Sequence, residues 1–158
     1  MKRWKSLIAA TTVAVLGSVM LFAFQQDEGQ LEVIWGKQWG TAAIEGADDI
    51  ALDRKGNIYI SGGTEGSLFG QNQGEWDIFV IKLGSKGQML WGKQFGSAGE
   101  EVSCEIAVDG EGNIYLFTET KEDWFGKSLG ERDTVLLKLS PDGQLLWGKR
   151  IGTNKDEL

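Results

Sequence analysis

The strings WGKQWG (residues 35–40), WGKQFG (residues 91–96) and WGKRIG (residues 147–152) decide the fold of this chain. Each string begins 56 residues after the one before it. The register also holds between them, because DRKGNIYI from Asp53 matches DGEGNIYL from Asp109 at the same offset. Self-similarity at a fixed period of this length indicates a protein built from one repeated supersecondary unit.

Each repeat has the sequence pattern of four β-strands joined by tight turns. Apolar and polar residues alternate in the segment 47–53, and the segments 57–63, 77–83 and 88–95 also fit the two-residue period of strands. Glycine stands in DRKGN and in GSKGQ, where a short hairpin needs a positive φ. No segment after Gln26 has helical spacing, so we predict an all-β fold of tandem four-stranded antiparallel units.

The repeat resembles a known family. Its succession is W-G-K-Q-[FW]-G, an acidic pair, I-A-[VL]-D-x-x-G-N-I-Y, a glycine-rich loop with F-G, and D-x-x-[VL]-x-K-L-x-x-x-G-Q-x-L-W. This is similar to the SBBP-type β-propeller repeat of exported bacterial proteins, over nearly all of residues 29–158. The resemblance implies β-propeller blades at about 41–96 and 97–152 after a leading strand at 31–39, which is an open arc or partial propeller. It implies little about activity.

The first 26 residues have the order of an export segment. Lys2, Arg3 and Lys5 precede an uncharged stretch at residues 7–24, and acidic residues follow. Two interpretations stay open, a cleaved signal peptide and a retained membrane anchor, and a buried helix of the fold is a third. The segment predicts an extracytoplasmic location in the periplasm, at the cell surface or in the medium.

The chain ends in TNKDEL (residues 153–158), whose last four letters match an endoplasmic reticulum retrieval signal. The repeat register offers another explanation. An offset of 56 residues places Asp156, Glu157 and Leu158 on two acidic residues and an aliphatic one at 100–102. We therefore predict that the terminus is the start of another repeat, with residence in the endoplasmic reticulum lumen as the alternative.

Composition excludes several kinds of chemistry. Histidine is absent and cysteine occurs once, so there is no Ser/His/Asp triad, histidine-ligated zinc or disulfide framework. The net charge is −7, and residues 27–158 hold 13 Lys+Arg against 23 Asp+Glu, or −10. Such an acidic surface repels phosphate backbones, so we expect no nucleic-acid partner.

Two pairs of carboxylates invite a catalytic interpretation, Asp53 with Asp109 and Asp77 with Asp133. Two such groups serve a carbohydrate-active enzyme as acid and base. Each pair, however, occupies equivalent positions one repeat apart, as turn residues do. The DGEGN turn also lacks the spaced oxygen ligands of a calcium loop. We therefore expect structural roles, and predict no catalytic residue, no metal and no cofactor.

Tryptophans are the candidate ligand-binding residues. Trp35, Trp91 and Trp147 recur in register, which predicts packing between adjacent sheets. Trp76 and Trp124 do not recur, and both lie beside the glycine-rich loop, where binding residues are expected. These two are our candidates for ligand binding. The single cysteine, Cys104, is expected to be a small semi-buried residue and not a nucleophile.

These features favour a noncatalytic exported module that binds proteins or glycans. The alternatives are a carboxylate-dependent carbohydrate-active enzyme and a fragment of a longer propeller with no independent function. Two blades and a strand leave the stacking surfaces at both ends of the arc uncovered, and uncovered repeat ends are poorly soluble. We therefore expect a homo-oligomer that completes a ring, with membrane contact only through residues 7–24.

Overall fold

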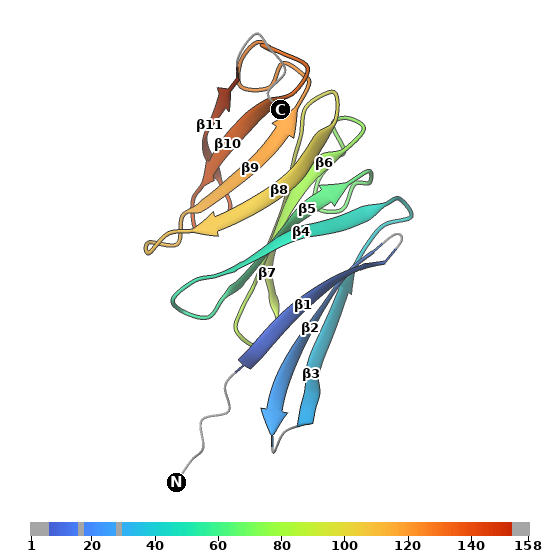
Figure 1. The fold of residues 1–158 in the computed structure, drawn as a ribbon, viewed down its shortest axis with the longest axis vertical. Helices are drawn as coiled ribbons and strands as arrows, with labels where there is room; N and C mark the ends of the chain where they lie inside the picture. The colour runs from blue at the N-terminus through green and yellow to red at the C-terminus, as the bar shows by residue number, and fades with distance from the viewer. Residues whose placement is uncertain (1–6, 16–17, 28–29, 153–158) are drawn as a thin grey trace.

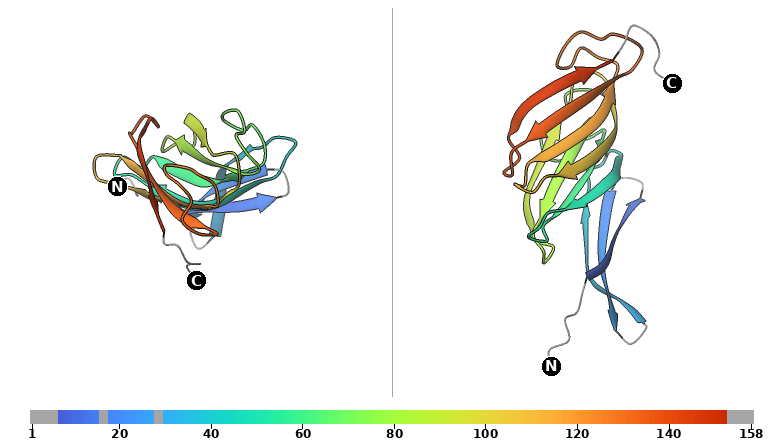
Figure 2. Two further views of the ribbon diagram at one scale, coloured as in Figure 1. Left: turned by 90° about the horizontal axis from the view of Figure 1, so that it is seen from above. Right: turned by 60° about the vertical axis from the view of Figure 1, so that its left-hand side comes forward.

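The computed structural model describes residues 7–15, 18–27 and 30–152 of the chain. This part of the chain contains no helix and forms three antiparallel sheets that do not close into a ring. The sheets lie one behind another in chain order (Figures 1 and 2). The all-β prediction is confirmed. Residues 153–158, on which the retrieval prediction depends, lie outside the described part.

We call the three sheets the leading sheet, the first repeat sheet and the second repeat sheet. The leading sheet has the order β1 (Leu7–Val15), β2 (Ser18–Asp27), β3 (Gln30–Trp39). The first repeat sheet contains β4 (Glu45–Leu52), β5 (Ile58–Thr64), β6 (Asp77–Leu83) and β7 (Met89–Phe95), paired in that order. The second contains β8 (Glu101–Val108), β9 (Ile114–Thr120), β10 (Asp133–Leu139) and β11 (Leu145–Ile151). Both repeat sheets are the predicted meanders.

Glycines at the hairpin turns have the predicted conformation. Gly56 and Gly112 follow the first strand of each repeat sheet with φ of 78° and 88°. Gly87 and Gly143 lie between the third and fourth strands with φ of 79° and 81°. Only glycine adopts this region without a steric penalty, so the turn residues fix the register of each hairpin.

An apolar core fills the space between the two repeat sheets. We call the side of a sheet that is turned toward the next sheet in the chain its front face, and the other side its back face. The front face of the first repeat sheet contributes Tyr59, Ile78 and Val80. The back face of the second contributes Ile114, Leu116, Val135, Leu137 and Leu139. Side chains alternate between the two faces of a strand, so this core uses every second residue.

A second core of the same design lies between the leading sheet and the first repeat sheet. Val19 and Leu21 of β2 are buried against the back face of the first repeat sheet, which contributes Ile58, Ile60, Phe79, Ile81 and Leu83. In the pairing of β2 with β3, Ala23 lies opposite Trp35, as Lys82 lies opposite Trp91 in the next sheet. A register shift comes directly after this position in both pairings. In the leading sheet, β2 therefore occupies the position that β6, the third strand, has in the first repeat sheet.

This arrangement changes two expectations about the N-terminal half. Residues 7–15 and 18–27 form strands, so the interpretation of this segment as a buried helix is wrong. The end of the arc formed by the first repeat sheet is also covered, because the leading sheet packs on it. The strand expected at 31–39 is β3, and it pairs with β2 of the same chain.

In the described part of the chain, no helix has the length and apolar character needed to cross a membrane.

The recurring tryptophans pack as predicted in two of their three positions. A β-carbon on Gly87 would lie 2.9 Å from the Trp35 ring, and one on Gly143 would lie 3.2 Å from the Trp91 ring. Each indole therefore covers the glycine turn of the following sheet. Trp147, in the last sheet, is 41% exposed.

Candidate functional site

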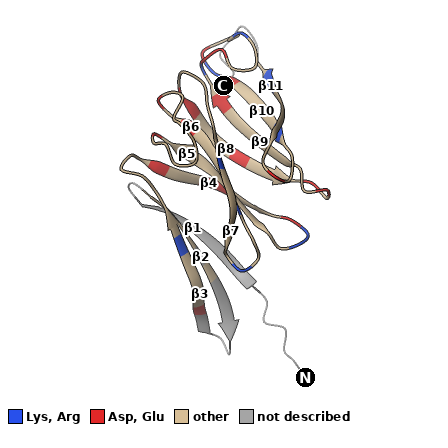
Figure 3. Cartoon of the chain, turned by 180° about the vertical axis from the view of Figure 1, so that it is seen from behind, with Lys and Arg blue, Asp and Glu red and all other residues tan. Residues whose placement is uncertain are grey.

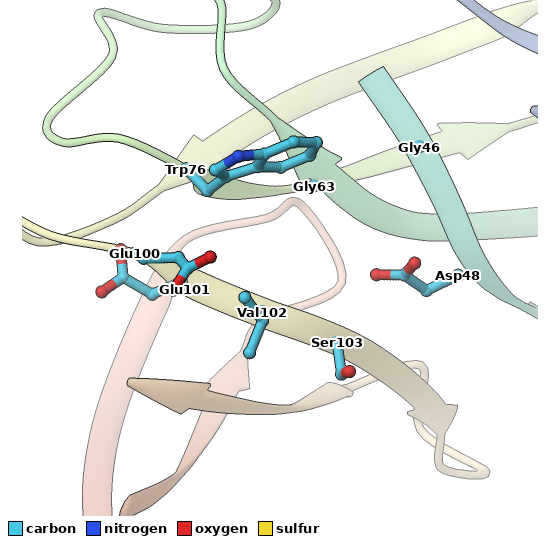
Figure 4. Close-up of a pocket in the computed structure, with 8 residues that line it drawn as sticks. All are labelled: Gly46, Asp48, Gly63, Trp76, Glu100, Glu101, Val102 and Ser103. Carbon is cyan, nitrogen blue, oxygen red and sulfur yellow. The ribbon is translucent and has the colours of Figure 1, made fainter. Parts of the chain in front are cut away.

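The candidate site is a cavity of about 350 Å³ between the first strands of the two repeat sheets. It is lined by β4 and the end of β5 on one side and by the start of β8 on the other. Figure 4 shows the indole of Trp76 beside Gly63, with Asp48 across the opening from Glu100 and Glu101. Its lining residues are Gly46, Asp48, Gly63, Trp76, Glu100, Glu101, Val102 and Ser103.

Backbone hydrogen bonds hold Trp76 at the cavity. The carbonyl of Trp76 accepts a hydrogen bond of 2.9 Å from the Glu101 amide, and the preceding Glu75 amide donates to the Gly99 carbonyl at 2.8 Å. The glycine at position 63 makes room for the ring, since a β-carbon there would lie 2.9 Å from it. The second repeat has Glu119 and Arg132 at these two positions. The Trp76 side chain is half-buried and available at the cavity.

Asp48 links the two repeat sheets at the cavity. Its carboxylate accepts a hydrogen bond of 2.9 Å from the Cys104 amide of β8. Burial raises the pKa of the Asp48 carboxyl, the Cys104 hydrogen bond opposes this increase, and the neighbouring Asp49 adds to it. Burial likewise raises the pKa of the fully buried Cys104 thiol. The thiol is thus protonated at neutral pH and is not exposed as a nucleophile.

The two glutamates of the cavity are already engaged. Glu100 accepts a hydrogen bond of 2.9 Å from Arg132 in a half-exposed ion pair. Glu101 is fully buried and accepts hydrogen bonds from the Ser97 amide at 2.7 Å and the Thr120 hydroxyl at 2.8 Å. The Asp48 carboxylate accepts the Cys104 hydrogen bond through one oxygen, so its other oxygen and the hydroxyl of the exposed Ser103 remain to contact a ligand. A bulge in β8 places Ser103 at a φ of 54°, a conformation that re-aims side chains out of a regular strand.

Trp124, the other tryptophan candidate, does not reach this cavity. Its ring lies 5.0 Å from that of Phe125, and it packs at the margin of the core between the repeat sheets. Its carbonyl accepts a hydrogen bond of 3.2 Å from Arg150. The structure therefore separates the two candidates, and of the two Trp76 is the one that lines this cavity.

Asp53 and Asp109 each stabilise their own turn. The Asp53 carboxylate accepts hydrogen bonds from the Lys55 amide at 2.8 Å and the Asn57 amide at 2.9 Å. Asp109 accepts the equivalent pair from Glu111 and Asn113, both at 2.9 Å. Both aspartates line one small cavity of about 80 Å³. Their oxygens are committed to the turns, as predicted from their repeated positions.

These hydrogen bonds also set the acidity of the two carboxyls. For Asp53, burial favours the neutral form, but the hydrogen bonds from Asn57, Lys55 and Tyr59 together hold its pKa below the ordinary value. For Asp109, the side chain of Asn113 is the main cause of a lowered pKa. A lowered folded pKa means that the folded state gains stability when the carboxyl ionises.

Replacing Asp53 by alanine should therefore lower the free energy of unfolding by about 0.5 to 2 kcal/mol, the range for losing a capping side chain. Urea unfolding monitored by circular dichroism measures the loss at neutral pH. The difference between wild type and variant should shrink below the unfolded pKa of about 3.9 and vanish once the pH falls through the folded pKa. Asp53→Asn, which retains one acceptor, is the matched control; an equal loss in both variants would contradict the hydrogen-bond explanation.

Four buried carboxylates hold loops in place by hydrogen bonds at the end of the repeat sheets opposite the Asp53 and Asp109 turns. Acidic positions at the start of β4 and β6 can be seen there in Figure 3. Glu45 accepts hydrogen bonds from Thr41 and Thr64, as Glu101 does from Ser97 and Thr120. Asp77 accepts a hydrogen bond of 2.9 Å from Gln94, and Asp133 pairs with Arg150. Glu45 and Glu101 were not among the predicted site residues, although an acidic residue that begins the first strand of both repeats was a usable signal. Asp77 and Asp133 thus each bind a side chain of the neighbouring strand in their own sheet.

No protein-family model matches the chain, and a comparison with curated proteins found no significant match. In the described part of the chain, no group of three or more metal-ligating side chains is placed to hold a metal ion.

Proposed function

We propose that the protein is a noncatalytic, exported interaction module that binds a carbohydrate in the cavity at Trp76. In this proposal the repeat sheets are β-propeller blades of the SBBP type. Residues 1–26 direct the chain out of the cytoplasm and are not removed afterwards, because β2 is part of the packed fold. The resemblance of the repeat supports the family and the location. The observation that carries the binding function is the half-buried indole at a cavity of about 350 Å³.

The side chains around the cavity suit a sugar ring. An indole offers a flat apolar surface, and nearby polar groups fix the orientation of a ligand that stacks on it. Asp48 and Ser103 lie across the cavity from Trp76 and supply a carboxylate and a hydroxyl for the hydroxyl groups of a sugar. Glu100 and Glu101 are held by Arg132, Ser97 and Thr120, which favours binding over acid–base catalysis.

A glycan array followed by calorimetry on the best ligand tests this proposal, using protein recovered from the cell envelope or medium of a bacterial host. Trp76→Ala should weaken binding by about tenfold, which corresponds to the loss of about 1.4 kcal/mol of aromatic contact. Trp124→Ala is the matched control and should bind as wild type does. Equal weakening in both variants, or no glycan binding by the wild type, would contradict the assignment.

A further inference from the structure

In the part of the chain that the structure describes, no other sheet packs on the front face of the second repeat sheet, and large apolar side chains are exposed on this face. Phe117, Trp147 and Ile151 are 43%, 41% and 52% exposed on it. The front face of the first repeat sheet is covered by the second repeat sheet, and the front face of the leading sheet is covered by the first repeat sheet. An exposed apolar surface of this kind marks an interaction site.

One substitution between the repeats distinguishes this face from the covered one. In the first repeat sheet, Ser61 is buried and donates a hydrogen bond to the Cys104 carbonyl of the sheet that covers it. Phe117 holds the equivalent position in the second repeat and can make no such bond. If another repeat sheet packed on this face as the second repeat sheet packs on the first, its backbone would occupy the space of the Phe117 ring. The face therefore suits a partner other than another repeat sheet.

Two rows of side chains cross this face in register. The pairings of the strands place Glu105 beside Phe117, Phe117 beside Leu136, and Leu136 beside Lys149. One row thus has an acid at one end, a lysine at the other and two apolar residues between them. The parallel row consists of Ala107, Tyr115, Lys138 and Trp147.

Both rows are self-complementary under a two-fold axis that runs parallel to the strands. Such an axis lays the first strand of the sheet over the fourth strand of a partner, and the second over the third. We propose that this face pairs with the same face of a second copy of the chain, so that the protein is a symmetric dimer. Isologous pairing of this kind is the commonest form of oligomer, and twisted sheets pack face to face within about 30° of alignment.

The contacts of this dimer follow from the two rows. Glu105 faces Lys149 of the partner subunit, and Phe117 faces Leu136 of the partner subunit. Ala107 faces Trp147 of the partner subunit, where a small residue leaves space for an indole. A hollow of about 240 Å³, lined by Ala107, Tyr115 and Phe117 among others, lies on the face at this position. The pairing covers the exposed apolar side chains and gives every charge of the first row an opposite neighbour.

A charge exchange tests the dimer, with sedimentation equilibrium or native mass spectrometry of the full chain as the measurement. Glu105→Lys should set two lysines against each other and weaken dimerisation by at least about tenfold, and Lys149→Glu should do the same with two acids. The double variant Glu105→Lys/Lys149→Glu should restore the dimer. Within one subunit the two side chains lie on the outer strands, about 14 Å apart, so the rescue has to come from the partner.

Two further variants separate this result from misfolding. Phe117→Ser, which introduces the residue of the first repeat, should yield a monomer with an intact circular dichroism spectrum. Lys121→Glu changes the charge by the same amount as Lys149→Glu, but in an exposed loop, and should leave the dimer unchanged. A monomer at all concentrations up to several hundred micromolar, a ring of three or four subunits, or single charge variants that dimerise as wild type does would each overturn the proposal.

Discussion

Replacing Arg150 by alanine should lower the free energy of unfolding by about 3 to 5 kcal/mol, the cost of leaving one member of a buried ion pair uncompensated. The Arg150 and Asp133 side chains are 4% and 0% exposed and are paired directly. The remaining support for the Asp133 carboxylate is a hydrogen bond of 2.8 Å from the Leu129 amide. Chemical denaturation of the variant and the wild type at low protein concentration measures the loss.

The first repeat supplies the control for this experiment. Gln94 holds the position of Arg150 there, and it donates a hydrogen bond of 2.9 Å to Asp77. Arg150→Gln should therefore cost much less than Arg150→Ala, because the amide keeps a donor at the carboxylate. If Arg150→Ala fails to fold, adding Asp133→Asn should recover folding by removing the buried charge. A loss below about 1 kcal/mol in Arg150→Ala would show that water reaches Asp133 and that the pair is not buried in solution.

Two adjacent leucines give the second large effect and a matched control in the same strand. Leu137 is fully buried in the core between the repeat sheets, and Leu136 lies on the uncovered front face. Leu137→Ala should destabilise the protein by about 2 to 5 kcal/mol through lost burial and the cavity that remains. Leu136→Ala should cost less than about 1 kcal/mol when it is measured on the dilute protein.

The contrast between the two leucines tests the assignment of the faces. A one-residue slip of β10 would exchange its two faces and reverse the order of the two effects. Equal effects would mean that both faces of the sheet are buried at the concentration used. Repeating the measurement at high protein concentration then separates burial by a second copy from burial within one chain, because only the former depends on concentration.

The local structure of this protein follows from its sequence because the information is repeated. The period of 56 residues appears in the matching of Asp53 with Asp109, and the two-residue period of a strand assigns the residues of 77–83 to the two faces of β6. Turn glycines such as Gly56 need a positive φ whatever surrounds them. These features depend on neighbouring residues in the chain, and so the strands, the turns and the roles of the turn aspartates were predictable.

Contacts between the sheets were decided by the tertiary structure, because equivalent residues of different repeats meet different neighbours. Trp91 is covered by the turn of the following sheet, whereas Trp147 has the same sequence context and is exposed. Trp76 and Trp124 were equally good candidates in the sequence, and the structure places Trp76 in a cavity whose other side is the start of β8 in the next repeat. The apolar N-terminal segment has the composition of an export signal, and its packing as β2 follows from the uncovered back face of the first repeat sheet. Apolar burial is not directional, so the sequence determined which surfaces need covering and the arrangement of the sheets determined what covers them.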